Sequence, residues 1–191
     1  MAVVINGKDL TIEEVIRVCR GMEKVEISEE AQAAVNKARG YIDSKLEEGA
    51  IIYGLTTGFG KFANVFIDMD QTAELQHNLI ISHTCGMGEP YEQKYVRAAM
   101  LLRCNALSRG NSGIRLSTIQ TMVDMLNAGV HPQVPCKGSL GASGDLAPLS
   151  FIALGLIGLG EVEYKGKIMP AADAMEKAGI SPVKLVAKEG L

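Results

Sequence analysis

The stretch Gly138-Ser-Leu-Gly-Ala-Ser-Gly-Asp-Leu-Ala-Pro148 is the most informative part of this chain. It contains three consecutive small residues, Ala142-Ser143-Gly144, and glycine leaves its amide nitrogen open to a close approach by the carbonyl carbon of Ala142. Closure of that ring, loss of water and elimination of the Ser143 hydroxyl would produce an electrophile from peptide alone. The triplet therefore indicates a candidate catalytic group that no ordinary side chain supplies.

The same stretch carries signals for the start of a helix. Ser143 and Asp145 are residue types that accept hydrogen bonds from the first free amides of a helix. Pro148 suits the first turn of a helix that starts near Leu146, because proline has no amide proton to leave unpaired there. Spacing alone leaves the capping role and the electrophile both open, and capping is the commoner use of such residues.

Length and composition indicate an ordinary globular protein. The chain has 191 residues, 47% of them hydrophobic and 21% charged, with a formal net charge of -3. This balance argues against disorder and gives no general attraction to nucleic acid or to anionic membranes. The four cysteines show no CxxC pair and no metal-ligand spacing, so we expect reduced thiols and a cytoplasmic location. No secretory signal or membrane-spanning segment is expected from the sequence.

Hydrophobic spacing and helix-end signals predict a mainly α-helical fold with a few short strands or hairpins. The expected helices cover residues 11–24, 28–46, 70–83, 90–110, 115–128, a segment from 145 onward, and 171–178. Residues 50–53 indicate a brief strand or an extended piece that enters a glycine-rich loop, and residues 131–143 indicate a loop. Residues 162–168 predict a small hairpin around Lys165-Gly166.

Two further residues are candidates for chemistry, each with a simpler alternative. Tyr53 begins a glycine-rich segment that could come close to a ligand, although tyrosine commonly packs its ring and exposes its hydroxyl. His83 stands at the end of a predicted helix, where an imidazole can interact with the helix carboxyl end. Taken alone, neither residue decides between catalysis and packing.

Four motifs give the whole chain a resemblance to the aromatic amino acid ammonia-lyases, and it looks most like the histidine-selective members. In family order they are Tyr53-Gly-Leu-Thr-Thr-Gly-Phe-Gly60, Ser82-His83 followed by Gly86-Met-Gly-Glu-Pro90, Arg109-Gly-Asn-Ser-Gly113, and the stretch from Gly138 to Leu149. Family members are considerably longer. The resemblance therefore implies that residues 1–191 are a single amino-terminal, electrophile-bearing portion, without the helical carboxyl-terminal part.

The resemblance also implies roles for individual residues. In this family the triplet matching Ala142, Ser143 and Gly144 cyclises without help into methylidene-imidazolone, so neither a metal nor pyridoxal phosphate is expected. The residue matching Tyr53 removes the β-proton of the substrate, and the residue matching His83 contacts the substrate side chain. Gly60 and Asp145 would then support the base loop and the new ring.

The activity implied is that of a carbon-nitrogen lyase, which eliminates ammonia from L-histidine to give urocanate, in a homotetramer. A tyrosine or phenylalanine ammonia-lyase or aminomutase of the same family is one alternative, and an inactive helical subunit or binding domain is another. The family's carboxylate-binding arginine matches no residue up to Leu191. We therefore expect the 191-residue chain alone to be inactive, because a substrate without its anchor loses the benefit of orientation.

Two other classes of protein fit the sequence poorly. A phosphate-binding loop needs four residues between its glycines and a Ser or Thr after the lysine, whereas five separate Gly54 from Gly60 and Phe62 follows Lys61. A serine hydrolase with Ser139 or Ser143 as nucleophile would need Gly-x-Ser-x-Gly after a strand, which neither serine has.

Overall fold

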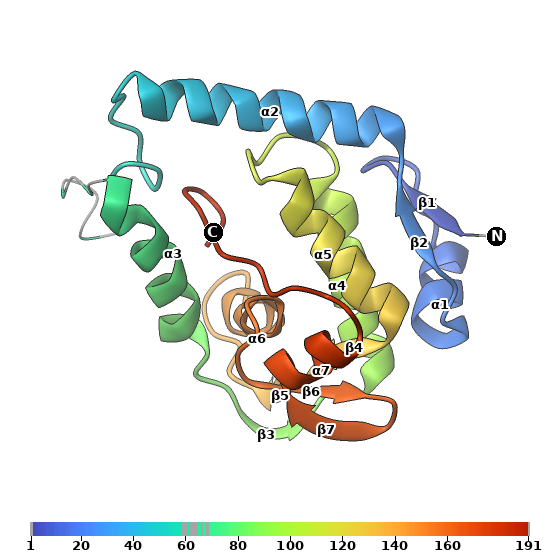
Figure 1. The fold of residues 1–191 in the computed structure, drawn as a ribbon. Coiled ribbons are helices and arrows are strands. Elements are labelled where there is room, and N and C mark those ends of the chain that lie inside the picture. The colour runs from blue at the N-terminus through green and yellow to red at the C-terminus, as the bar shows by residue number, and fades with distance from the viewer. Residues whose placement is uncertain (1, 59–60, 62–64, 66, 68, 191) are drawn as a thin grey trace.

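The structure, a computed structural model, describes residues 2–58, 61, 65, 67 and 69–190. Helices predominate and strands are short, which confirms the prediction of a mainly α-helical fold (Figure 1). The helices are α1 (Ile12–Gly21), α2 (Glu29–Glu47), α3 (Met69–His83), α4 (Gln93–Leu107), α5 (Leu116–Ala128), α6 (Leu146–Leu156) and α7 (Ala171–Lys177). The strands are β1 (Val3–Ile5), β2 (Val25–Ile27), β3 (Met87–Pro90), β4 (Val130–Pro132), β5 (Pro135–Lys137), β6 (Glu161–Tyr164) and β7 (Lys167–Pro170).

Within the described residues the strands form three small sheets. β1 pairs with β2 in parallel, β3 pairs with β5 antiparallel, and β6 lies between β4 and β7 in an antiparallel sheet. The predicted hairpin is confirmed as the β6–β7 turn, where Lys165 has φ 51° and Gly166 has φ 73°. Positive φ at both central residues is the conformation that matches the twist of the flanking strands.

Local signals set several helix ends as predicted. Thr11 and Glu14 form a capping box at the start of α1, with each side chain accepting a hydrogen bond from the other residue's amide. The Ser28 hydroxyl accepts the amide of Ala31 at 3.2 Å and opens α2. Gly129, at φ 76°, ends α5 in the left-handed conformation that glycine adopts without strain.

Other predicted boundaries were wrong. α4 begins at Gln93 rather than at Pro90, because Pro90 belongs to β3 and pairs with Pro135. The predicted 131–143 loop contains β4 and β5, whose strand partners lie far along the chain. Residues 50–53 lead into a turn as predicted, but the strand alternative is absent, since the amide of Ile52 donates to the Thr56 hydroxyl instead of to a neighbouring strand.

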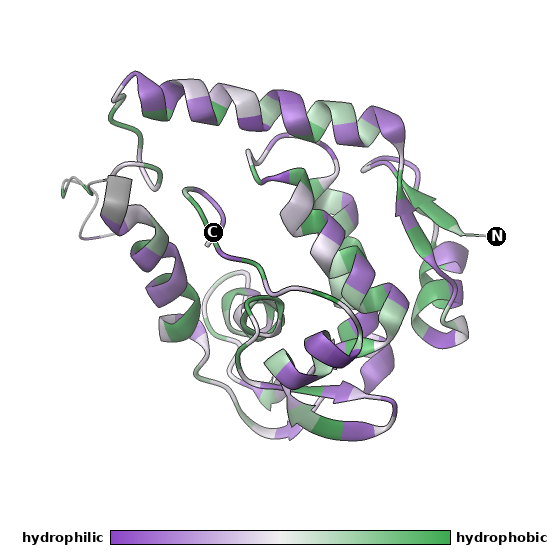
Figure 2. Ribbon diagram, viewed as in Figure 1, coloured by the Kyte–Doolittle hydropathy of each residue, from purple (hydrophilic) through white to green (hydrophobic). Residues whose placement is uncertain are grey.

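The core lies where α4 packs against α1 and α5 (Figure 1). Its largest fully buried apolar side chains include Met100, Leu101, Ile119, Met125 and Leu126. Figure 2 shows hydrophilic and hydrophobic residues alternating along α2, which crosses one side of the molecule, whereas α6 is mostly hydrophobic. In the part of the chain that the structure describes, no helix has the length and apolar character needed to cross a membrane.

A buried guanidinium links three parts of this core. Arg97 is 1% exposed and donates hydrogen bonds to the carbonyl oxygens of Val18 and Leu126, at the ends of α1 and α5. It also donates to Nε2 of His131 at 2.8 Å. A guanidinium can only donate, so Nε2 of His131 accepts this hydrogen bond and the ring is neutral. Burial and the nearby Arg97 lower the pKa of His131 to about 4.

Acid should therefore weaken this fold through His131. In the unfolded chain, His131 has the ordinary histidine pKa of 6.5 and binds a proton below that pH. In the folded protein, the same ring does not bind a proton until about pH 4. The free energy of unfolding should thus fall by about 3 kcal/mol across this interval because of His131, and this contribution should be constant above it. His131→Gln keeps an acceptor for Arg97 and cannot titrate. Urea unfolding at a series of pH values gives the free energy of unfolding, which should fall less steeply between pH 6.5 and 4 in the variant than in the wild type. Equal slopes in the two proteins would contradict the lowered pKa of His131.

Candidate active site

The Ala142-Ser143-Gly144 triplet lies in the loop between β5 and α6, beside the amino end of α6. Gly144 has φ 72°, a conformation in which other residues are strained. A Cβ atom at this position would also collide with the hydroxyl of Ser139. The loop therefore requires glycine at 144, the residue whose amide nitrogen the predicted ring closure uses.

Ser139 holds the carboxyl side of the triplet in place. Its hydroxyl donates a hydrogen bond to the carbonyl oxygen of Gly144 at 2.7 Å. The contact could not be predicted from the sequence, where Ser139 is a candidate only as a hydrolase nucleophile, because no motif signals a hydrogen bond between two loop residues five positions apart. Ser139 is thus a residue that shapes the triplet loop.

The hydrogen bonding of the Asp145 carboxylate differs from the sequence prediction. It occupies the position before α6, but among the described residues its carboxylate caps no amide of the helix, so the capping prediction for this side chain was wrong. The carboxylate instead accepts a hydrogen bond from the hydroxyl of Ser143 at 2.5 Å. That bond, followed by the bond from its own amide, lowers the pKa of Asp145 below its usual range. Asp145 is therefore an ionised acceptor that orients the Ser143 hydroxyl.

His83 ends α3, which packs beside α6. Its Nδ1 lies 2.7 Å from the carbonyl oxygen of Leu79 and 3.2 Å from the Ser82 hydroxyl. A carbonyl oxygen can only accept, so Nδ1 carries the proton and Nε2 is the acceptor nitrogen of the neutral ring. The helix-end interaction that the sequence left open is thus present, and it fixes which ring nitrogen can accept from a ligand.

Tyr53 lies in a turn after α2 and is 59% exposed. The structure thus brings Ser139, Ser143, Gly144 and Asp145 together in one loop, whereas Tyr53 and His83 come from two other elements. Gly60, the predicted supporting residue, lies outside the described residues. Among the residues that are described, no three His, Cys, Asp or Glu side chains gather as metal ligands.

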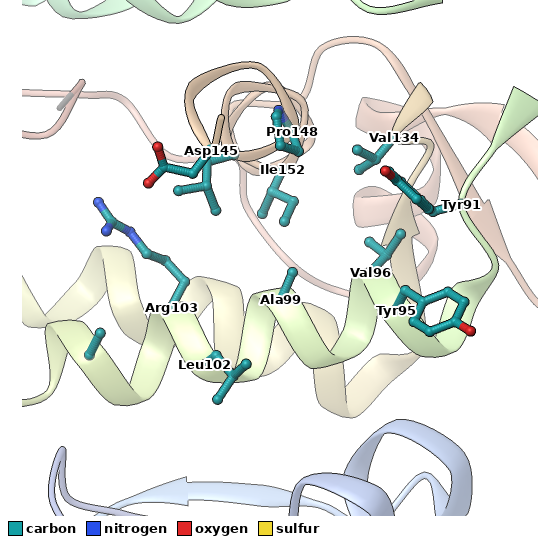
Figure 3. A pocket seen from close by; sticks show the side chains of 12 residues that line it. Tyr91, Tyr95, Val96, Ala99, Leu102, Arg103, Val134, Asp145, Pro148 and Ile152 are labelled. Atoms are coloured by element: carbon teal, nitrogen blue, oxygen red, sulfur yellow. The ribbon is translucent and has the colours of Figure 1, made fainter. Parts of the chain in front are cut away.

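An apolar groove of about 520 Å³ runs between α4 and α6 (Figure 3). Arg103 and Asp145 extend toward one another at one end of it, and Tyr91 and Tyr95 lie at the other. Leu102 lines the groove and is 51% exposed. Arg103 could not be predicted as a site residue from the sequence, since a single arginine on an amphipathic helix carries no signal until the fold places it opposite Asp145.

Comparison with known proteins identifies the class of protein that carries this loop. The model of the aromatic amino acid lyase family matches residues 10–191. The chain belongs to this family. A curated relative, the histidine ammonia-lyase of Alkaliphilus oremlandii, is 55% identical over 189 residues, which are 99% of this chain and 37% of the relative. The chain thus spans little more than a third of the length of this relative.

Solved structures have the same fold. The ergothioneine-degrading enzyme ergothionase of Treponema denticola matches with a TM-score of 0.95 and 38% identity, over 100% of this chain and 38% of that one. The histidine ammonia-lyase of Trypanosoma cruzi matches with a TM-score of 0.91 and 38% identity, over 100% of this chain and 37% of that one. Two enzymes with different names are therefore 38% identical to this chain and share its fold.

Proposed function

We propose that the whole protein is a histidine ammonia-lyase that eliminates ammonia from L-histidine to give urocanate. The observation that carries this proposal is the 55% identity to the histidine ammonia-lyase of Alkaliphilus oremlandii, which extends over nearly all of this chain. Residues 1–191 would form its amino-terminal, electrophile-bearing portion, and the whole protein would be a homotetramer. The exposed apolar groove beside α4 supports association with further protein surface.

The triplet loop suits an electrophile made from the backbone. Glycine is required at 144, and the Ser143 hydroxyl, which the ring closure must eliminate, is held by the ionised Asp145. When formed, a methylidene-imidazolone supplies an electron-poor carbon that makes the ammonia of an amino acid easier to expel. Asp145 would orient Ser143 before closure and remain a hydrogen-bond acceptor beside the loop afterwards.

The other two residues would handle the substrate directly. Tyr53, which is 59% exposed, would take the β-proton of histidine as general base. His83 would bind the substrate imidazole through Nε2, because Nδ1 already donates to the carbonyl of Leu79. A neutral His83 of this tautomer accepts a hydrogen bond from the N–H of the substrate ring.

A related activity on another amino acid is the alternative. Ergothionase of Treponema denticola is as similar in sequence identity as the histidine ammonia-lyase of Trypanosoma cruzi, so the shared fold does not select the substrate. A tyrosine or phenylalanine ammonia-lyase or aminomutase would use the same triplet loop and a differently occupied side-chain pocket. Turnover of tyrosine by the whole protein at a rate that rivals histidine would favour this alternative.

Removal of the imidazole at position 83 tests the choice of substrate. In the whole protein, His83→Leu should lower kcat/KM for L-histidine by about 10²-fold, because the N–H of the substrate ring would face an apolar side chain. The measurement is the growth of urocanate absorbance. His77→Leu, at an exposed position of the same helix, is the matched control and should keep wild-type turnover. A His83→Leu variant with unchanged kcat/KM would assign selectivity to other residues.

A further inference from the structure

A threonine hydroxyl fixes the backbone just before Tyr53. Thr56 Oγ1 accepts a hydrogen bond from the amide of Ile52 at 2.9 Å. The same hydroxyl donates to the carbonyl oxygen of Ala50 at 2.9 Å. With one bond accepted and one donated, this hydroxyl ties the chain that enters the turn to the chain that leaves it.

A second threonine fixes the backbone just after Tyr53. Thr57 Oγ1 accepts the amide of Gly54 at 3.2 Å and donates to the carbonyl oxygen of Gly58 at 3.1 Å. Gly54 itself has φ 67°, so the chain bends sharply directly after Tyr53. The amides of Ile52 and Gly54, on either side of Tyr53, therefore both donate hydrogen bonds to threonine hydroxyls.

Burial separates the supporting residues from the residue they support. Thr56 and Thr57 are each 4% exposed and Leu55 is fully buried, whereas Tyr53 is 59% exposed. Backbone bonds of 3.0 Å from the amides of Leu55 and Thr56 to the carbonyl of Ile52 complete the turn. A buried, hydrogen-bonded turn costs free energy to distort, because each hydroxyl and amide would lose a partner away from water. The turn thus holds the exposed residue Tyr53 on a rigid, buried stretch of backbone.

We propose that Thr56 and Thr57 are positioning residues for Tyr53, which fix the direction of its side chain by holding the backbone amides on either side of it. The proposal rests on the proposed function, in which Tyr53 removes the β-proton. Neither threonine is assigned a contact with substrate. Both act through the backbone, on the distance and angle from which the phenol oxygen reaches that proton.

Kinetics of the whole protein test this proposal at two sites. Thr56→Val and Thr57→Val keep the shape of the side chain and remove the hydroxyl. Each should lower kcat by about 10²-fold with little change in KM, since a misplaced base slows proton transfer more than it weakens binding. Thr56→Ser and Thr57→Ser restore the hydroxyl and should recover most of the lost kcat. Equal losses in the serine and valine variants, or a wild-type kcat in the valine variants, would overturn the proposal.

A matched control separates positioning from general loss of stability. Ser108 is another buried hydroxyl, 1% exposed, and it donates to the carbonyl of Cys104 at the end of α4. Ser108→Ala should lose stability comparably and keep kcat. If Ser108→Ala lowered kcat as far as the threonine variants do, the effect would be one of stability and the positioning role would fall.

Amide hydrogen exchange tests the hydrogen bonds of the two threonine hydroxyls independently of turnover. The amide of Ile52 should exchange about tenfold faster in Thr56→Val, and the amide of Gly54 should do so in Thr57→Val, the factor expected for one lost hydrogen bond. Peptides covering residues 50–58 report both amides by mass spectrometry. Unchanged exchange would overturn the positioning role alone, whereas a wild-type protein that exchanges as expected but turns over no histidine would count against the proposed function alone.

Discussion

Ser143→Ala is expected to remove both the electrophile and the activity of the whole protein. Alanine has no hydroxyl to eliminate, so the triplet can form no exocyclic methylene group. The wild-type protein should be lighter than its sequence predicts by two water molecules, and the variant should lack this loss. Turnover of L-histidine should fall by at least about 10³-fold, because the group that draws electron density from the substrate is absent.

Intact mass and urocanate absorbance check this prediction together. Ser143 is exposed and bonds to an exposed aspartate, so the variant should fold and unfold like the wild type. Ser117→Ala, at an exposed position of α5, serves as the control and should keep both the mass loss and the activity. A wild-type mass that equals the sequence mass would remove the electrophile from the proposal altogether.

Tyr53→Phe should abolish most turnover while leaving the electrophile intact. Phenylalanine keeps the aromatic ring but has no oxygen to accept the β-proton, and loss of a general base typically costs about 10²- to 10⁴-fold in rate. The mass loss of two water molecules should persist, since Tyr53 lies on a different element from the triplet loop. This combination, a formed ring with little turnover, distinguishes the base from Ser143.

Tyr41→Phe provides the matched control for that experiment. Tyr41 is 61% exposed on α2, nearly the same exposure as Tyr53, and it lies outside the proposed site. Its variant should keep wild-type kcat. If Tyr53→Phe also retained kcat within the error of the assay, another group would have to remove the proton, and the positioning role of Thr56 and Thr57 would lose its basis.

Features set by neighbouring residues were predictable from the sequence. The caps at Thr11 and Ser28, the end of α5 at Gly129 and the turn at Lys165-Gly166 all depend on contacts within about four residues. The triplet loop belongs to the same group, because three small residues before a helix are visible in any reading of the chain. Family motifs then predicted the class of protein that the comparisons confirm.

Features that join distant residues were not predictable. β1 and β2 lie about twenty residues apart and pair in parallel around α1, so neither strand has a local signal of its own. Pro90 shows the same limit, since proline at the start of a helix and proline in a short strand look alike until β5 supplies the partner.

The sequence by itself determined which residues can do chemistry, and the tertiary structure decided how they are held. Asp145 could be recognised from its position before a helix, but only the folded chain places its carboxylate opposite Arg103 of α4, at one end of the apolar groove. Likewise Arg97 can be buried because the ends of α1 and α5 offer it carbonyl oxygens and β4 offers it the neutral imidazole of His131. Residue types and their local spacing are written in the chain, whereas the partner of a polar group depends on which groups packing leaves within hydrogen-bonding distance.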